Sequence, residues 1–141
     1  MEKESINSKT ESIKDGLEAY REDISTDIIK DIQRMSPGKT GLVIIKGPNI
    51  GDKFLINKTT ITIGRTPESD IFLDDITVSR KHAEINKTGD GFTINDSGSL
   101  NGSYLNGKIV ESAVLNNMDR IQIGKYMFLF FNSKKISGKK A

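Results

Sequence analysis

The sequence predicts an all-β domain, a sandwich of about ten to eleven short strands, preceded by a tail of a different character. From Gly41 to Phe131, short apolar or alternating runs recur and are separated by Gly, Asn and Asp. No stretch of helical periodicity interrupts these runs, which argues against an alternating α/β plan. The first 39 residues instead repeat aliphatic side chains at helical spacing.

Each expected strand combines β-branched or aromatic residues and ends at a residue typical of turns. Asn106-Gly107 separates two of the strands and is a favoured hairpin turn, which is the structural role we assign to Asn106. In chain order, the expected strands are 42–46, 53–56, 60–63, 70–73, 83–86, 92–95, 103–105, 108–110, 120–123 and 126–131.

The inward-facing side chains of these strands would form one hydrophobic core, large enough for a self-supporting domain. The expected core residues are Val43, Ile45, Phe54, Ile61, Ile63, Ile71, Ala83, Ile85, Phe92, Ile94, Leu115, Ile121, Ile123, Phe128 and Phe130. We therefore take residues 41–131 as the folded domain and residues 132–141 as a basic, disordered C-terminus.

The tail, residues 1–39, carries an apolar stripe at three- and four-residue steps, which predicts an amphipathic helix over 11–35. The stripe consists of Ile13, Leu17, Tyr20, Ile24, Ile28 and Ile32. Gly16 weakens such a helix by ~1 kcal/mol relative to Ala, and without a partner it is marginal. The tail is therefore expected to be disordered or partly helical, and residues 36–40 to be a linker. Three uses remain open: docking on its own domain, partner binding or dimerisation, and an unfolded tail carrying a phosphorylation site.

Composition narrows the function classes for this chain of 141 residues. With zero cysteines there is neither a disulfide scaffold nor a thiol nucleophile. The net charge of +2 is too small to indicate nucleic-acid binding, and no apolar run or signal sequence indicates a membrane, so we expect a cytoplasmic protein. Residues 1–39 hold seven Lys and Arg against nine Asp and Glu, whereas residues 40–141 hold fourteen against ten. A mildly basic domain beside a mildly acidic tail suits an anionic ligand.

Four polar residues at separated turns have the chemistry to capture a phosphorylated threonine: Arg65, Ser79, Arg80 and Asn101. Phosphothreonine brings up to two negative charges and three acceptor oxygens. A guanidinium can give it two parallel charge-assisted hydrogen bonds, and a serine hydroxyl one more. Asn101 offers both a donor and an acceptor, which suits a peptide backbone. Taken singly, each of these residues is more often a solvated or turn-forming residue.

Four further residues are expected to support this site. Gly64 and Gly102 would permit close backbone approach or positive φ. His82 is the only histidine in the chain. With no second histidine or any cysteine beside it, a structural brace is a better interpretation of His82 than a base or metal ligand. Ser99 lies close to Asn101 in sequence.

The ordered combination Gly64-Arg65, Ser79-Arg80-Lys81-His82 and Asn101-Gly102 resembles the forkhead-associated (FHA) domain, a module that reads phosphothreonine. The resemblance runs from about Gly41 to Phe131 and implies an FHA-type β-sandwich. It implies that Arg65, Ser79, Arg80 and Asn101 bind the phosphothreonine, and that His82 braces the loops. One position departs from the pattern: many relatives carry Thr or Ser immediately before the Asn, where this chain has Leu100.

The run from Asp70 to Arg80 looks especially similar to small bacterial FHA regulators of 2-oxoglutarate and glutamate metabolism. In those regulators, a Ser/Thr protein kinase phosphorylates a tail threonine, and the phosphorylated tail binds the protein's own FHA domain. The acidic lead Glu22-Asp23 and the aliphatics after Thr26 match that tail segment, so Thr26 is the first candidate phosphorylation site and Thr10 a weaker one. The resemblance implies 2-oxoglutarate dehydrogenase or glutamate dehydrogenase as a partner.

The sequence therefore predicts a phosphothreonine-dependent signalling module rather than an enzyme, with no catalytic residues, metal or cofactor. Its partners would be phosphothreonine-containing proteins, or its own phosphorylated tail. An alternative is a scaffold that docks phosphorylated proteins while the N-terminal helix mediates assembly. Recovery of one metabolic enzyme or of many phosphoproteins would separate the two.

Overall fold

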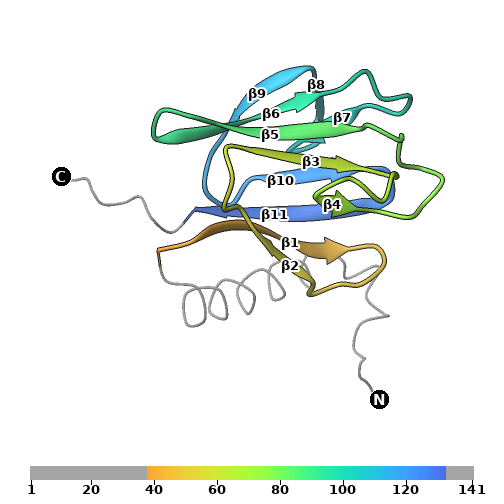
Figure 1. The fold of residues 1–141 in the computed structure, drawn as a ribbon, viewed down its shortest axis with the longest axis horizontal. Coiled ribbons are helices and arrows are strands. Elements are labelled where there is room, and N and C mark those ends of the chain that lie inside the picture. The colour runs from red at the N-terminus through yellow and green to blue at the C-terminus, as the bar shows by residue number, and fades with distance from the viewer. Residues whose placement is uncertain (1–37, 133–141) are drawn as a thin grey trace, which may run out of the picture. The chain divides into compact units, whose positions relative to one another are not determined.

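The structure is a computed structural model that describes residues 38–132, and within that range every regular element is a β-strand. Eleven strands form two sheets that lie face to face (Figure 1). No helix able to span a membrane occurs among these residues. The strands are β1 (Thr40–Lys46), β2 (Lys53–Leu55), β3 (Thr60–Gly64), β4 (Ile71–Phe72), β5 (Ala83–Thr88), β6 (Gly91–Asp96), β7 (Ser103–Leu105), β8 (Lys108–Val110), β9 (Ser112–Leu115), β10 (Arg120–Ile123) and β11 (Tyr126–Asn132).

The two sheets have the orders β2-β1-β11-β10-β7-β8 and β4-β3-β5-β6-β9. Neighbouring strands run antiparallel except for β3 and β4, which pair in parallel. The Asn106-Gly107 turn joins β7 to β8 with positive φ at both residues, 51° and 88°. This is the backbone that a tight hairpin needs and that Asn and Gly adopt with little strain.

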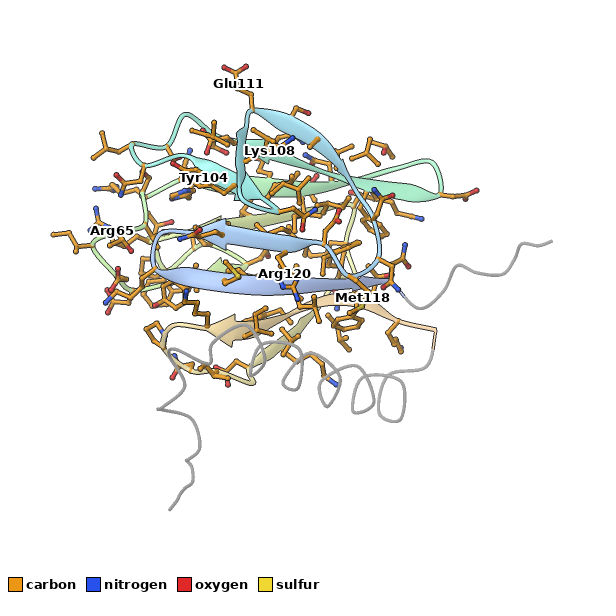
Figure 2. All side chains as sticks on the ribbon, turned by 180° about the vertical axis from the view of Figure 1, so that it is seen from behind. Arg65, Tyr104, Lys108, Glu111, Met118 and Arg120 are labelled. Atoms are coloured by element: carbon orange, nitrogen blue, oxygen red, sulfur yellow. The ribbon has the colours of Figure 1, made fainter. Side chains whose placement is uncertain are left out.

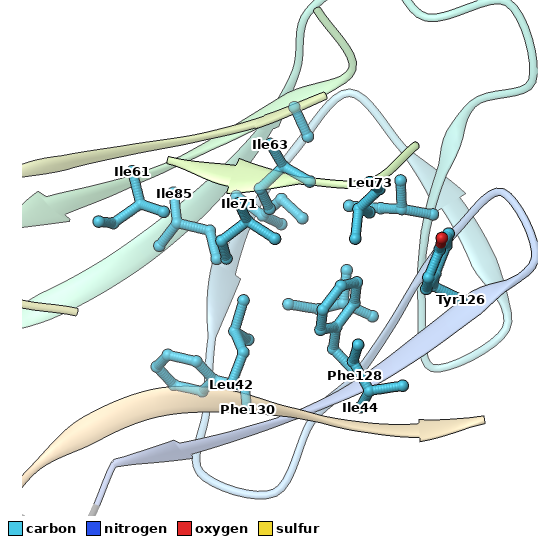
Figure 3. Packing of buried hydrophobic residues seen from close by; sticks show 14 of the residues in the cluster. Leu42, Ile44, Ile61, Ile63, Ile71, Leu73, Ile85, Tyr126, Phe128 and Phe130 are labelled. Carbon is cyan, nitrogen blue, oxygen red and sulfur yellow. The ribbon is translucent and has the colours of Figure 1, made fainter. Parts of the chain in front are cut away.

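The core lies between the sheets and consists of aliphatic and aromatic side chains from both (Figure 3). Phe128 and Phe130 of β11 are fully buried, and Phe92 stacks edge-on against Phe130 with ring centroids 5.9 Å apart. The buried cluster also includes Leu73 and Val78, which lie in the connection between β4 and β5. The core therefore holds the base of this connection against the sheets.

The all-β prediction is confirmed, and the differences from expectation are local. Val43 and Ile45 are buried, but Leu42 and Ile44 occupy the inter-sheet core in their place. Phe54 is only half-buried at the edge of that core. β1 and β11 are apolar at nearly every position, so period-two alternation does not reveal which side of either strand faces inward.

Some boundaries also differ from those expected. β9 was not predicted as a strand. Thr40 begins β1 and is not part of the linker, and Asn132 ends β11 and is not part of the C-terminal tail. The predicted helix over 11–35 and the threonines Thr10 and Thr26 lie outside the described residues, as do residues 133–141.

Candidate binding site at the loop end of the sandwich

Three connections carry the predicted site residues: 65–70 after β3, 73–82 before β5, and 97–102 between β6 and β7. We call these the site loops. Arg65 begins the first of them directly at the end of β3, and its side chain is exposed. Figure 2 shows Arg65 among the loops at one end of the sandwich, with Met118 toward the other. Loops on a rigid β scaffold are where binding residues commonly lie.

Arg65 is held in place by the second site loop. Its backbone N–H donates to the carbonyl oxygens of Ser79 and Arg80, at 3.0 and 3.1 Å. Its side-chain Nε donates to the carbonyl oxygen of Val78 at 2.9 Å. With Nε occupied, the two terminal nitrogens of the guanidinium are the donors that remain for a ligand.

Ser79 lies between the second and third loops. Its Oγ accepts the backbone N–H of Leu100 at 2.9 Å. A hydroxyl that accepts one hydrogen bond still has its own hydrogen to donate. The side chain of Leu100 is 89% exposed and contributes no polar group, but its backbone orients the Ser79 hydroxyl. Although Leu100 lacks the hydroxyl that many FHA relatives carry at this position, its backbone N–H still holds the Ser79 hydroxyl.

Asn101, in the third site loop, makes a hydrogen bond to the second site loop. Its Nδ2 donates to the carbonyl oxygen of Thr77 at 3.1 Å, and the amide oxygen of this exposed residue is an acceptor that a ligand can use. The Arg80 side chain is exposed beside Ser79, and its backbone carbonyl is one of the two that receive the Arg65 N–H. The structure thus brings all four predicted binding residues to the same three loops.

His82 is 0% exposed and joins the loops from beneath. Its Nδ1 accepts the backbone N–H of Ser79 at 3.0 Å, so Nε2 carries the hydrogen that is donated to the Gly102 carbonyl at 2.8 Å. Its backbone N–H also donates to Ile63 of β3 at 3.0 Å. Both ring nitrogens are therefore engaged in structural hydrogen bonds, as expected of a brace.

Asp96, at the end of β6, anchors the third loop and was not singled out in the sequence. Its carboxylate accepts hydrogen bonds from the hydroxyls of Ser99 and Ser103, at 2.6 and 2.7 Å, and from the backbone N–H groups of Gly98 and Ser99. Burial raises the pKa of Asp96, but these hydrogen bonds outweigh it and hold the pKa below its usual range. Ser99 donates its hydroxyl hydrogen to Asp96, so this hydroxyl supports the loop and is not a donor for a ligand.

Asp75 is a second anchor that sequence reasoning missed. Its carboxylate accepts both the hydroxyl and the backbone N–H of Thr77 and pairs with the Lys125 ammonium at 3.0 Å. The hydrogen bond from the Thr77 hydroxyl is the main reason that the pKa of Asp75 falls to about 2. Thr77 Oγ1 in turn accepts a hydrogen bond from the backbone N–H of Lys125 at 3.0 Å. These contacts fix the carbonyl that Asn101 holds. An acid two residues before a threonine was the only available signal.

Gly64 and Gly102 meet different backbone requirements. A Cβ on Gly64 would lie 2.1 Å from the Arg80 carbonyl oxygen, so only glycine lets the first and second loops approach. Gly102 has a φ of 85°, and a Cβ there would lie 2.7 Å from Ile109. Gly64 thereby sets the spacing between the first and second site loops, and Gly102 lets the third site loop pass close to Ile109 of β8.

The site loops present fixed cationic, hydroxyl and amide groups at the end of a rigid sandwich. This arrangement has the chemistry of a β-sandwich module for binding phosphorylated peptides, because a guanidinium and a hydroxyl can donate to phosphate oxygens and an amide can pair with a peptide backbone. The sequence model of the FHA domain family matches residues 61–124. The chain belongs to the FHA family, and residues 61–124 lie in an FHA phosphothreonine-binding domain.

Relatives of similar length share this domain. The chain is 48% identical over 104 residues to the oxoglutarate dehydrogenase inhibitor of Corynebacterium jeikeium, covering 74% of this chain and 72% of that protein. It is 47% identical over 107 residues to the glycogen accumulation regulator GarA of Mycolicibacterium smegmatis, covering 76% and 68% of the two chains.

Solved structures agree in fold. The structure superimposes on an FHA domain studied for its phosphothreonine-dependent interactions with a TM-score of 0.61 and 26% identity, covering 66% of this chain and 95% of that one. It also matches Mycobacterium tuberculosis EmbR in complex with a low-affinity phosphopeptide, with a TM-score of 0.65 and 30% identity, covering 81% of this chain and 30% of EmbR.

Proposed function

We propose that this protein is a kinase-controlled inhibitor of a central-carbon or nitrogen enzyme, whose phosphorylated tail can occupy its own FHA site. The observation that carries the proposal is the hydrogen-bonded cluster of site loops around Arg65 and Ser79. We assign phosphothreonine contact to Arg65, Ser79, Arg80 and Asn101, with Gly64, His82, Ser99 and Gly102 in support. Relatives named for oxoglutarate dehydrogenase inhibition and for glycogen accumulation support the metabolic role.

The role is one of binding instead of catalysis. His82, the only histidine, uses both ring nitrogens in hydrogen bonds to backbone groups, so neither nitrogen is available as a general base. The chain contains no cysteine that could act as a nucleophile. We place the protein in the cytoplasm, where a metabolic enzyme and a Ser/Thr kinase would both reach it.

The length of the connecting chain favours an intramolecular lid. Residues 27–39 separate Thr26 from the start of β1 and could span up to ~45 Å when extended. A flexible link of that length gives a local concentration near ~1 mM. Against an intrinsic Kd of ~1 μM, the closed state would dominate by roughly a thousandfold. Phosphorylation of Thr26 would therefore shut the site without any new fold.

Pull-down experiments test the choice of partner. Unphosphorylated protein, Thr26-phosphorylated protein and Arg65→Ala protein would each be used as bait, with capture read by mass spectrometry. We expect 2-oxoglutarate dehydrogenase or glutamate dehydrogenase to be recovered by unphosphorylated protein and lost on phosphorylation. Recovery of many phosphoproteins instead would identify a scaffold.

The lid itself is tested by NMR before and after kinase treatment. Phosphorylation at Thr26 should shift the amide signals of residues 64–66, 79–82 and 99–103 in a protein that stays monomeric. Thr26→Ala is the control for phosphorylation at Thr10. Unmoved site loops, or dimers that grow with concentration, would rule out the intramolecular lid.

A further inference from the structure

The chain contains two Asn-Gly pairs, Asn101-Gly102 and Asn106-Gly107, and the structure places them in different settings. An asparagine followed by glycine is prone to deamidation, because glycine has no Cβ that would hinder attack of its backbone nitrogen on the asparagine side chain. Asn101 lies in the third site loop, whereas Asn106 lies in the hairpin between β7 and β8. The same reaction would therefore have different consequences at the two positions.

The chemistry of deamidation sets a geometric requirement. The backbone nitrogen of the glycine loses its proton to water or hydroxide and attacks Cγ of the asparagine. A bond forms between this nitrogen and Cγ, the bond from Cγ to Nδ2 breaks, and Nδ2 takes up a proton and leaves as ammonia. Water then opens the cyclic imide at either of its carbonyl groups, which gives aspartate or isoaspartate. Ring closure thus requires an asparagine that can rotate and a glycine N–H that is free to lose its proton.

Asn106 is locked against this rotation. Its φ of 51° and the φ of 88° at Gly107 belong to the tight turn that joins β7 to β8. Both ends of its side-chain amide are held, because Nδ2 donates to the Asp119 carboxylate at 3.0 Å and Oδ1 accepts the Arg120 N–H at 2.9 Å. Cγ of Asn106 can reach the Gly107 nitrogen only if the hairpin and these hydrogen bonds open together.

Asn101 is held less tightly. It does not share the positive φ of Asn106, and its side chain is exposed. Within residues 38–132, its amide is held at one end, through the hydrogen bond from Nδ2 to the carbonyl oxygen of Thr77 at 3.1 Å. The attacking group is restrained separately, because the Gly102 N–H donates to Ser99 Oγ at 2.9 Å. Two single hydrogen bonds in an exposed loop therefore oppose ring closure at Asn101.

We propose that Asn101 is a site of spontaneous deamidation, and that the reaction irreversibly switches off the reading of phosphothreonine. The product carboxylate has an acceptor in place of the Nδ2 donor, so it cannot hold the Thr77 carbonyl oxygen, which is itself an acceptor. It also adds a negative charge beside Leu100, whose backbone N–H holds Ser79, and this charge repels a phosphate. The loss of binding rests on the proposed ligand contact of Asn101, whereas the position of the reaction does not.

A bound ligand should slow the reaction. In the proposed site, the amide oxygen of Asn101 accepts a hydrogen bond from the peptide backbone while Nδ2 keeps its bond to Thr77. Both ends of the Asn101 amide are then held, as they are at Asn106 in the free protein. Protein in complex with a ligand would therefore keep its site, and protein without one would lose it with age.

Peptide mapping by mass spectrometry tests where the chain reacts. The full chain is kept in warm, mildly alkaline buffer, and aspartate and isoaspartate at the two positions are followed over time. We expect Asn101 to react several times faster than Asn106, and more slowly when a phosphothreonine peptide is present. Ser99→Ala frees the Gly102 N–H and should speed the reaction at Asn101 alone. In urea, where the fold is lost, Asn101 and Asn106 should react at similar rates.

Calorimetry on two variants tests the consequence for binding. Asn101→Asp should weaken binding of a phosphothreonine peptide by about tenfold or more, because a donor is lost and a like charge is added. Asn106→Asp makes the same chemical change outside the site loops and should keep the wild-type affinity. If Asn101→Asp bound as tightly as the wild type, Asn101 would not contact the ligand, and its deamidation would not switch off the site.

Two results of the mapping would overturn the proposal by themselves. One is an Asn101 that stays intact in the folded chain while the chain in urea reacts. The other is an equal rate at Asn101 and Asn106 in the folded chain. Both results leave the proposed phosphothreonine binding untouched, because the affinity of fresh protein does not depend on them.

Discussion

The sandwich and the site loops are held together by different forces. Between the sheets, large apolar side chains such as Phe128, Phe130 and Ile85 pack without polar partners, and the stabilisation is spread over many residues. In the loops, a few side chains each make several hydrogen bonds: His82 to two backbone groups, Asp96 to two hydroxyls and two amides. The loops therefore depend on individual residues in a way that the sheets do not.

This difference separates two kinds of substitution. Removing the exposed Arg65 guanidinium should weaken binding strongly and stability little, because its one structural hydrogen bond goes to the Val78 carbonyl. Removing the buried brace His82 should lower both binding and stability. Hydrogen bonds that are already made in the free protein also mean that little has to be ordered when a ligand binds.

Arg65→Ala should weaken binding of a phosphothreonine peptide by about 3 kcal/mol, or roughly a hundredfold or more, because it removes a charge-assisted fork. The melting temperature should fall only slightly, since the Arg65 backbone contacts remain and only the hydrogen bond from Nε to the Val78 carbonyl is lost. Isothermal titration calorimetry and a thermal melt measure the two quantities. Lys81→Ala removes an exposed cation from the second site loop and is the matched control. If both variants lost affinity equally, general electrostatic attraction would explain the binding.

His82→Ala should lower the free energy of unfolding by about 2–3 kcal/mol, because two backbone groups lose their buried partner and a cavity is left. Phosphopeptide affinity should fall with it. His82→Gln keeps an amide donor and acceptor and should recover part of the stability. Denaturant unfolding is the measurement. If the His82→Ala protein were as stable as the wild type, His82 would not be a brace for the site loops.

Ser79→Ala should weaken phosphopeptide binding by about 1–2 kcal/mol, roughly tenfold, because one hydroxyl donor to a charged acceptor is lost and the Leu100 N–H loses its acceptor. The control is Ser97→Ala, an exposed serine in the third site loop. Calorimetry under the same conditions compares the two. If the Ser79→Ala protein bound the phosphopeptide as tightly as the wild type, the Ser79 hydroxyl would not contact the phosphate.

The Asp75 anchor should make the loops sensitive to acid. The pKa of Asp75 is about 2 in the folded protein and lies below its ordinary value of 3.8, so its contribution to stability is present above about pH 4 and is lost as the pH falls toward 2. Asp70 and Asp96 also have lowered pKa values, so the wild type is compared with Asp75→Asn. The stability difference between the two should shrink across this window. A constant difference would contradict the anchor.

Much of the fold could be predicted from the sequence, and the errors have physical reasons. Alternation in β3, β5 and β6 identified inward residues correctly, because each of these strands has one apolar and one polar side. β1 and β11 lack that contrast, so the prediction named Val43 and Ile45, which are buried, and missed Leu42 and Ile44, which belong to the inter-sheet cluster. β9 was missed because it is only four residues long. Of its three apolar residues, only Leu115 is buried.

The site residues were recognised through ligand chemistry and the FHA pattern, and the structure brings them to common loops. Asp75, Thr77 and Asp96 were missed because their partners are backbone amides and hydroxyls whose positions depend on tertiary structure. An aspartate near a serine or threonine is common in turns, so it gives no signal of an anchor by itself.

The central claim is that the site loops read the phosphate on a threonine. The most direct test is an NMR titration of the full chain with two peptides that differ only in phosphorylation of one threonine. The phosphorylated peptide should shift the amide signals of Arg65, Ser79, Leu100 and Asn101, with no change in β9, and the unphosphorylated peptide should shift none of them. Equal shifts from both peptides, or shifts confined to the sheets, would contradict the claim.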